Sequence, residues 1–363
     1  MLEFLATSDI HHDDYKNGIT LADTIAVEDE ITQYAINHSI NLVIFAGDLY
    51  RSTNPLHHVI NAAEAAWKRR SDVGIVTFAM PGNHDYFTKS ITSGHAFASV
   101  NIFSTDLKNV TVVDKVQILN VQGINFLFVP AGHVTTLPQP TNAAPTVIVF
   151  HDLIAGSYLS GGRPADDGID VSEINKVGAI LVLGGDNHIP QSLSKIIPSG
   201  FYLGAPLQHN WGDRDQNRGF WHIKITTDGK PIVHSTLIPT NSPKFIRITM
   251  PACTTDVETI MALQHKLNEY TNRSAIIEVT LIGDKTININ QEVVKNAILE
   301  LGHRSVRIIL SQVMTKIELI PQSISQPEDK WNYFVTNTTN VDLDINLLSK
   351  IGTWAISEAR KII

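Results

Sequence analysis

Five short clusters of aspartate, asparagine and histidine in the first 188 residues have the residue types that bind divalent metal ions. In chain order the clusters are Asp9-Ile10-His11, Gly47-Asp48, Gly82-Asn83-His84-Asp85, His151 and Gly184-Gly185-Asp186-Asn187-His188. Oxygen and imidazole ligands without sulfur favour manganese, iron, magnesium or zinc. One such cluster alone is weak, because a Gly-Asp pair or an Asp-x-His commonly lies in an ordinary turn. The five together predict a single metal site.

Each cluster directly follows an apolar segment with the length of a buried strand. These segments are Leu2–Ser8, Asn41–Ala46, Gly74–Met80, Val147–Phe150 and Ala179–Leu183. Helical spacing of apolar residues at Ile19–Ile40, and a further helical segment at Pro55–Arg70, separate the first three of them. This alternation predicts a sheet sandwiched by helices. Loops at the ends of strands carry functional groups in α/β folds, so we expect the five clusters to meet.

The remaining sequence indicates further elements and a second folding unit. Strand-like segments follow at Val110–Val113 and Ile124–Val129, and Phe220–Leu237 has the pattern of a hairpin with its turn at Asp228-Gly229. After a plausible linker at Pro239–Pro243, the pattern becomes strand, helix, strand, helix, strand, and Leu343–Ile362 is an amphipathic helix. We therefore predict three parts, namely residues 1–240, 244–320 and 322–363.

Composition narrows the class of protein. The chain has 363 residues, enough for two domains, and it contains no run of about 18 apolar residues that would predict a membrane span. No basic stretch followed by an apolar one opens the sequence, so we expect no secretion signal. The single cysteine, Cys253, excludes an internal disulfide and a cysteine metal cage, and it favours a cytoplasmic location.

The net charge of the chain argues against a protein that binds nucleic acid through overall electrostatic attraction alone. The formal net charge is −8. Residues 1–100 hold 12 acidic and 6 basic side chains, and three of the acids belong to the clusters described above. Bound divalent cations would offset part of this negative charge.

The order D-x-H, GD, GNHD, H and G-x-x-H resembles that of the calcineurin-like metallophosphoesterases. GNHD is the most specific of these motifs, and the resemblance covers roughly residues 3–240. It implies an α/β fold in which a β-sandwich is flanked by helices. It also implies two divalent metal ions, for which we expect Mn²⁺, with Mg²⁺, Fe²⁺ or Zn²⁺ as alternatives. Such a pair can activate a hydroxide and stabilise both the attacking and the leaving oxygen of a phosphodiester.

The resemblance also assigns ligands by position. The first ion would be held by Asp9, His11, Asp48 and His188, and the second by Asp48, Asn83, His151 and Asp186. Asp48 would therefore bridge the two ions. The nuclease branch of the family usually has histidine at the position of Asp186, as G-H-x-H. An aspartate there predicts either an altered metal preference or a weakly held second metal.

Two further residues are expected to act in the chemistry. His84 resembles the family's non-ligand histidine, which would stabilise charge on the phosphate or protonate the leaving oxygen. Asp85 would then orient the His84 imidazole. An equally good interpretation is that Asp85 caps the start of a helix.

Three features favour DNA as the substrate. Gly47-Asp48-Leu49-Tyr50, with Pro55 seven residues after the aspartate, resembles the G-D-[LV]-[FY] motif of SbcD-type nucleases. Tyr202–Pro206, Trp211–Asp213 and Arg218–Phe220 resemble the Y-x-G-S-P, F-G-E and K-G-F block of the same enzymes. The predicted α/β unit also stands where they carry a DNA-capping domain. The resemblance thus implies a metal-dependent DNA exonuclease or endonuclease subunit in repair, recombination or replication.

The same resemblance implies partners. SbcD-type nucleases use a C-terminal helical segment to bind an SMC-like ATPase of the SbcC type, so we expect DNA and this ATPase as partners and no membrane. We also expect a homodimer within a heterotetramer. The helix could instead pack on its own domain. Alternatives for the whole protein are a small-nucleotide phosphodiesterase and a non-catalytic scaffold with an altered metal site. GDLYRSTN lacks the Arg-Gly pair usual in protein phosphatases. Strand polarity and single- or double-strand preference stay open.

Overall fold

The computed structural model describes most of the chain up to residue 312. The described residues are 1–14, 18–87, 94–97, 107–132, 136–158, 163–166, 168–213, 217–268, 275–283, 289–312, 329 and 331. The segment 322–363 that we expect to bind a partner lies outside them, apart from Asp329 and Trp331. The helix predicted at Leu343–Ile362 falls outside them entirely.

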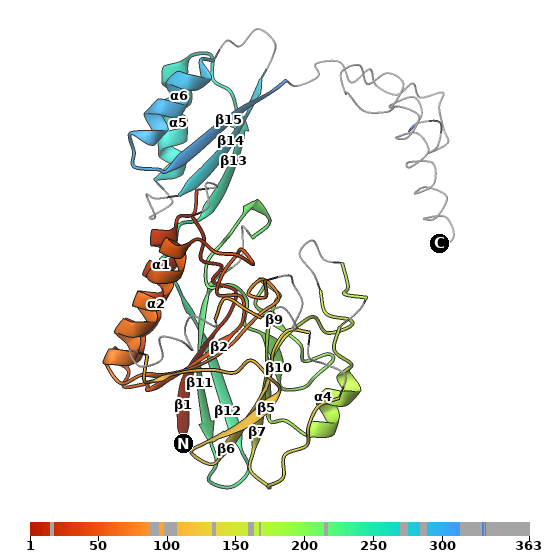
Figure 1. Ribbon diagram of the computed structural model, residues 1–363. Helices are drawn as coiled ribbons and strands as arrows, with labels where there is room; N and C mark the ends of the chain where they lie inside the picture. The colour runs from red at the N-terminus through yellow and green to blue at the C-terminus, as the bar shows by residue number, and fades with distance from the viewer. Residues whose placement is uncertain are drawn as a thin grey trace.

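Two mixed six-stranded sheets form the larger part of the described chain (Figure 1). The first has the order β12-β11-β1-β2-β3-β4, formed by β1 (Leu2–Thr7), β2 (Leu42–Ala46), β3 (Val76–Met80), β4 (Val110–Val112), β11 (Gly219–Thr226) and β12 (Ile232–Pro239). The second has the order β5-β6-β7-β8-β10-β9, formed by β5 (Gln117–Val121), β6 (Ile124–Val129), β7 (Thr146–His151), β8 (Leu181–Gly185), β9 (Gln191–Ser192) and β10 (Gly200–Tyr202).

The two sheets pack face to face over a shared apolar core. Phe4 of β1 meets Phe126 of β6 edge to face, with 5.3 Å between ring centroids. Phe78 of β3 lies 6.0 Å from Phe128 of β6 in the same way. Alternate side chains of a strand point to opposite faces, so the remaining apolar residues of these strands face the helices outside.

Helices cover the outer faces. The first sheet is covered by α1 (Leu21–Asn37) and α2 (His57–Asp72), and the second by the short α4 (Val171–Val177). A capping box made by Thr20 and Asp23 begins α1. A buried ion pair between Glu28 of α1 and Arg70 of α2 joins the two helices. No helix among the described residues is both long and apolar enough to cross a bilayer.

The predicted β-sandwich flanked by helices is confirmed, whereas the single sheet predicted from the alternation is wrong. Two sheets are present, and β5, β9 and β10 were not predicted. Apolar runs mark buried strands, but they carry no information on which strands pair. The hairpin predicted at Phe220–Leu237 is confirmed, since β11 and β12 pair antiparallel from Gly219 opposite Pro239 to Thr226 opposite Ile232.

A third, smaller sheet follows in the chain. Its parallel strands are β13 (Phe245–Pro251), β14 (Ile276–Gly283) and β15 (Ser305–Gln312), and α5 (Asp256–Leu267) and α6 (Gln291–Leu299) pack on one face (Figure 1). Phe245 and Ile276 belong to the core cluster beneath α1, and Arg304 pairs with Asp23. The third sheet is therefore attached to the sandwich near the start of α1.

Candidate metal centre

The five sequence clusters meet where β1, β2, β3, β7 and β8 end. The backbone N–H of Asp9 donates to the carbonyl oxygen of Gly47 (2.9 Å), and that of His84 donates to Oδ1 of Asp48 (2.9 Å). The backbone N–H of Asp186, from the other sheet, donates to Oδ1 of Asp9 (3.2 Å). Backbone hydrogen bonds thus fix the loops against one another before any ion binds.

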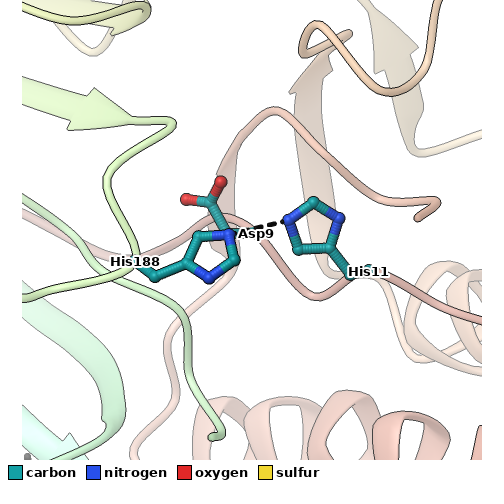
Figure 2. Close-up of side chains that lie close together, drawn as sticks. All are labelled: Asp9, His11 and His188. Carbon is teal, nitrogen blue, oxygen red and sulfur yellow. Dashed lines mark hydrogen bonds between the residues drawn. The ribbon is translucent and has the colours of Figure 1, made fainter. Parts of the chain in front are cut away.

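One group of side chains suited to a cation combines Asp9, His11 and His188 (Figure 2). One ligand atom from each lies within 4.8 Å of the others. The Nε2 atoms of His11 and His188 are 3.0 Å apart. Three of the four residues expected around the first metal ion are therefore brought together.

A second group combines Asp9, Asp48 and His151, again with ligand atoms within 4.8 Å of one another. Nδ1–H of His151 donates to the carbonyl oxygen of Ala46 at 2.6 Å, which leaves Nε2 for the centre. This hydrogen bond also fixes the ring orientation, as is usual for metal-binding histidines. His151 and Asp48 come from different sheets, so the second group lies across the top of the sandwich.

Asp48 lies between the two groups. Its Oδ2 is 3.5 Å from Nε2 of His11, and its Oδ1 is 3.4 Å from Nε2 of His151. Burial opposes ionisation of this carboxyl, but the positive charge of His151 prevails and holds the pKa of Asp48 low. An ionised carboxylate with one oxygen toward each group has the arrangement that a bridging ligand needs.

Several polar atoms at this centre are buried without a hydrogen-bond partner. They include Oδ2 of Asp9, Oδ1 of Asn83 and Nε2 of His151. An unsatisfied buried polar atom costs about 1–3 kcal/mol, so a cluster of them calls for an explanation. All three are good donors to a divalent cation. The residues present therefore fit the implied metal ions.

Asn83 and Asp186 lie beside the second group, on its more open side. Nδ2 of Asn83 donates to Oδ1 of Asp186 at 3.4 Å, and the same oxygen is 3.9 Å from Nε2 of His151. The Asp186 side chain is 21% exposed, against 2% for Asp48. Asp186 is therefore more open to solvent than the carboxylate that lies between the two groups.

The electrostatics of this cluster favour cations. Burial raises the pKa of Asp9 to about 6 even though His151 and His188 oppose this shift. Burial also raises the pKa of Asp186, and it lowers the pKa of His11 well below its usual value. Despite burial, the neighbouring carboxylates raise the pKa of His151 well above its usual value and also raise that of His188, so these histidines take up positive charge that divalent ions could supply instead.

The backbone is strained at four of the expected ligands. Asp9, His11, Asp48 and Asp186 have φ angles of 55°, 52°, 58° and 74°. Residues with a Cβ rarely adopt this left-handed conformation, and such residues cluster at functional sites. The strain turns the four side chains toward the centre.

Glycine is required beside these ligands because the loops approach so closely. A Cβ on Gly82 would lie 2.1 Å from Oδ1 of Asp48, and one on Gly47 would lie 2.2 Å from Nδ1 of His151. Neither contact is sterically allowed. The glycines of the GNHD and GD clusters thus let two loops close around Asp48 and His151.

His84 lies beside the first group of ligands, whereas the Asp85 carboxylate faces the loop after β2. Nδ1–H of His84 donates to the carbonyl oxygen of Arg51 (2.8 Å), and its ring lies 5.0 Å from that of His11. The buried carboxylate of Asp85 instead accepts backbone N–H groups from Gly82, Asp48, Leu49 and Tyr50. The expectation that Asp85 orients the imidazole needs correction, because Asp85 secures the loop that carries Asp48.

Two residues that the sequence did not single out support the centre. Nε2–H of His209 donates to the carbonyl oxygen of Asp9 (2.9 Å), and burial lowers the pKa of His209 to about 3. Oδ2 of Asp213 is 3.9 Å from Nδ1 of His188, on the far side of that ring from His11. Burial would raise the pKa of Asp213, but His188 and Arg218 lower it to about 2. No spacing rule pointed to either residue, although Asp213 belongs to the Trp-Gly-Asp motif.

Replacing Asp213 by asparagine should weaken metal binding about 10–100-fold, the usual effect of losing a carboxylate behind a metal-binding histidine. Asparagine keeps the size of the side chain but removes the charge that makes His188 more basic. Isothermal titration of the metal-free protein with Mn²⁺ measures the effect. Asp228→Asn, in the exposed β11–β12 turn, is the matched control. Equal Mn²⁺ affinity of Asp213→Asn and wild type would show that Asp213 does not support His188.

Comparison of the sequence with known proteins identifies a family. Residues 2–190 match the family model of the calcineurin-like phosphoesterases. The DNA double-strand break repair protein Mre11 of Haloferax volcanii is 22% identical over 289 residues, which cover 78% of this chain and 62% of that protein. The chain thus spans less than two thirds of that relative.

Solved structures resemble the chain only distantly. A dimetal phosphatase from Danio rerio, 8% identical, superposes with a TM-score of 0.43 over 64% of this chain and 95% of its own. The nuclease MPE of Pseudomonas putida, 17% identical, gives a TM-score of 0.25 over 44% of this chain and 66% of its own.

Proposed function

Because the chain belongs to the calcineurin-like phosphoesterase family, we propose that it hydrolyses phosphodiester bonds of DNA with two divalent metal ions. One observation carries this proposal. The Asp48 carboxylate directs one oxygen to His11 and the other to His151, among buried ligand atoms that have no other partner. Asp9, His11, Asp48 and His188 would hold one ion, and Asp48, Asn83, His151 and Asp186 would hold the other.

The residues around these ligands have separate roles in the proposed reaction. When bound, the two ions supply stabilisation of the negative charge that develops on the phosphate. His84 keeps its Nδ1 proton on the carbonyl oxygen of Arg51, so Nε2 is the nitrogen left to hold or deliver a proton at the leaving oxygen. Asp85 keeps the Asp48 loop in place, and Gly47 and Gly82 let that loop close on His151.

DNA is preferred as substrate for two reasons. The relative that matches most of this chain is named as a DNA double-strand break repair protein. In the described part of the chain both helices of the third sheet pack on one face, and Arg247, Glu278 and Arg307 form a row across the other at paired positions. A polar sheet face with two arginines suits a nucleic-acid backbone, and we assign residues 244–320 the role of a DNA-capping domain.

The proposed function is tested by comparing three substrates in parallel. The purified protein with Mn²⁺ should shorten end-labelled duplex DNA and hydrolyse bis-p-nitrophenyl phosphate, whereas a cyclic nucleotide should be hydrolysed poorly. Hydrolysis of the cyclic nucleotide without any DNA cleavage would replace the nuclease by a small-nucleotide phosphodiesterase. No hydrolysis of any substrate, with every divalent metal tried, would indicate a scaffold. The lengths of the end-labelled products also show which strand end is degraded and whether cleavage is exonucleolytic or endonucleolytic.

Asp186 should set the metal preference. A carboxylate is a harder ligand than an imidazole, so the natural protein should favour Mn²⁺ or Mg²⁺ over Zn²⁺. Asp186→His should shift the preference toward Zn²⁺. The ratio of hydrolysis rates of bis-p-nitrophenyl phosphate with Mn²⁺ and with Zn²⁺ measures this, with Asp152→His, one residue after His151, as a control. An unchanged ratio in Asp186→His would place this residue outside the coordination shell.

We further propose that the segment 322–363 binds an SMC-like ATPase of the SbcC type, and that two copies of each chain assemble. The apolar positions of Leu343–Ile362 fall at helical spacing, which suits binding in a groove. The net charge of −8 supports dependence on a partner for duplex DNA.

Deletion of residues 322–363 should abolish complex formation with such an ATPase while hydrolysis of bis-p-nitrophenyl phosphate continues at the wild-type rate. Co-purification and analytical ultracentrifugation measure the first effect. A full-length chain with Ile351 and Trp354 replaced by serine is the matched control, because it keeps the segment and removes only part of its apolar face. Co-purification of the truncated chain with the ATPase would contradict the docking role.

A further inference from the structure

The guanidinium group of Arg218 is buried but only partly bonded. Arg218 is 5% exposed. Its Nη2 lies 3.2 Å from Oδ1 of Asp213 and donates to the Asp213 carbonyl oxygen at 3.3 Å. Its Nε and Nη1 are buried and have no hydrogen-bond partner among the residues that the structure describes. An arginine offers five N–H donors in a rigid fork, so part of this fork is left for a ligand.

A small cavity lies beside this group, at the junction between the β11–β12 hairpin and the start of β13. Its volume is about 40 Å³. Among the described residues it is lined by Gln208, Asn217, Arg218, Pro239, Thr240, Ser242 and Lys244. A cavity of this size holds either ordered water or one small polar group. We refer to it as the Arg218–Lys244 cavity.

The lining of the Arg218–Lys244 cavity is positive. Two of its residues are cations, and none of those described is a carboxylate. Asp213 contacts the guanidinium, but its charge is shared with His188. Burial outweighs Asp213 and lowers the pKa of Arg218, which nevertheless stays charged at neutral pH. Arg218 therefore shares the charge of Asp213 with His188, and no carboxylate among the described residues pairs with Lys244.

We propose that the Arg218–Lys244 cavity binds a phosphate group, namely a backbone phosphate of the DNA strand that is bound at the metal centre. The guanidinium of Arg218 and the ammonium of Lys244 suit the anionic oxygens of a phosphate. Contacts of this kind fix the register of a strand without reading its sequence. Free inorganic phosphate would present the same oxygens to these groups. The assignment of the phosphate to DNA therefore rests on the proposed function.

The cavity connects to the metal centre through one carboxylate. Asp213 contacts Arg218 with Oδ1 and approaches His188 with Oδ2. Its backbone carbonyl also accepts from Arg218, and its carboxylate also accepts the backbone N–H of His209. A phosphate on Arg218 would therefore lie close enough to the metal centre to belong to the same bound strand. It would also hold that strand against the junction with the third sheet.

The first test uses metal-free protein, so that no step depends on catalysis. Binding of a fluorescent single-stranded oligonucleotide is measured by anisotropy in EDTA, across a range of KCl concentrations. Lys244→Gln should reduce the slope of log K against log salt by about 0.7, the value for one phosphate contact on a single strand. Lys230→Gln, in the exposed β11–β12 turn, should leave the slope unchanged. Equal slopes for Lys244→Gln and wild type would overturn the assignment to DNA.

The second test separates DNA from free phosphate. Melting temperatures are compared in inorganic phosphate and in chloride at equal ionic strength, with EDTA present. A phosphate-specific rise that disappears in both Lys244→Gln and Arg218→Gln supports a phosphate site, whereas no rise in wild type indicates ordered water and overturns it. The melting curve in chloride shows whether Arg218→Gln is folded. If it is not folded, the test relies on Lys244→Gln alone.

The two tests also distinguish failure of this inference from failure of the proposed function. If wild type hydrolyses bis-p-nitrophenyl phosphate and DNA while Lys244→Gln changes neither slope nor melting, only the cavity assignment is wrong. If wild type neither binds nor cleaves DNA but shows the phosphate-specific rise, the cavity binds free phosphate and the assignment to DNA falls with the nuclease function.

Discussion

Asp48→Ala is expected to lose both metal ions and to slow hydrolysis of a phosphodiester by at least about 10³-fold. The two carboxylate oxygens face different histidines, His11 and His151, so one substitution removes a ligand from each ion. Metal catalysis contributes several kcal/mol to transition-state stabilisation, and every 1.36 kcal/mol is a factor of ten in rate. Metal content by mass spectrometry and turnover of bis-p-nitrophenyl phosphate with Mn²⁺ should fall together.

The control for this prediction separates metal binding from folding. Oδ1 of Asp48 also accepts the backbone N–H of His84, so alanine could disturb the loop. Asp48→Asn keeps a hydrogen-bond acceptor of the same size but lacks the charge and the second anionic oxygen. Both variants should melt cooperatively and lack activity, while Asp228→Asn behaves as wild type. Wild-type turnover in a folded Asp48→Ala would refute the assignment of the metal centre.

His84→Ala is expected to retain both ions yet slow cleavage about 10²–10⁴-fold, the usual contribution of a general acid. Nδ1 of His84 is engaged with the carbonyl oxygen of Arg51, and the ring lies 5.0 Å from the His11 ring, beside the metal group rather than within it. Metal content should therefore stay at the wild-type level while kcat falls. His234→Ala, on the exposed face of β12, is the matched control.

A second substrate sharpens the His84 prediction. A general acid matters less when the leaving group is already a good one, so the loss should be greater for DNA than for bis-p-nitrophenyl phosphate. Loss of metal from His84→Ala would show that His84 is a ligand. An equal loss with both substrates would assign it to stabilisation of phosphate charge instead of proton transfer.

The strands that carry the ligands could be predicted from the sequence because they are short, apolar and each followed by a polar cluster. β2 begins one residue and β3 two residues later than predicted, and both end at the predicted residue. The distribution of these strands between two sheets could not be predicted. The clearest example is β10, a three-residue strand that pairs parallel with β8 and has too few residues to show any periodicity.

The residues of the candidate centre also fall into those that could be predicted from the sequence and those that could not. Asp9, His11, Asp48, His151 and His188 could be selected because a strand and a motif placed each of them, and the structure brings them together. The residues that form hydrogen bonds with the backbone and the rings of these ligands could not be predicted. Asp85 stands next to His84 in sequence, yet its carboxylate faces the loop after β2. His209 supports Asp9 from about 200 positions away, and only the folded chain shows this.

The left-handed backbone at four expected ligands bears on how this chain evolves. A residue with a Cβ costs about 1–2 kcal/mol more than glycine in that conformation. At Asp9, His11, Asp48 and Asp186, selection for stability alone would therefore favour glycine, which would also relieve the crowding of three carboxyl groups. This chain nevertheless has a carboxylate or imidazole side chain at all four positions, which stability alone does not explain. In a lineage that no longer needed the metal ions, these four positions should be among the first to change to glycine, well before the apolar strands behind them.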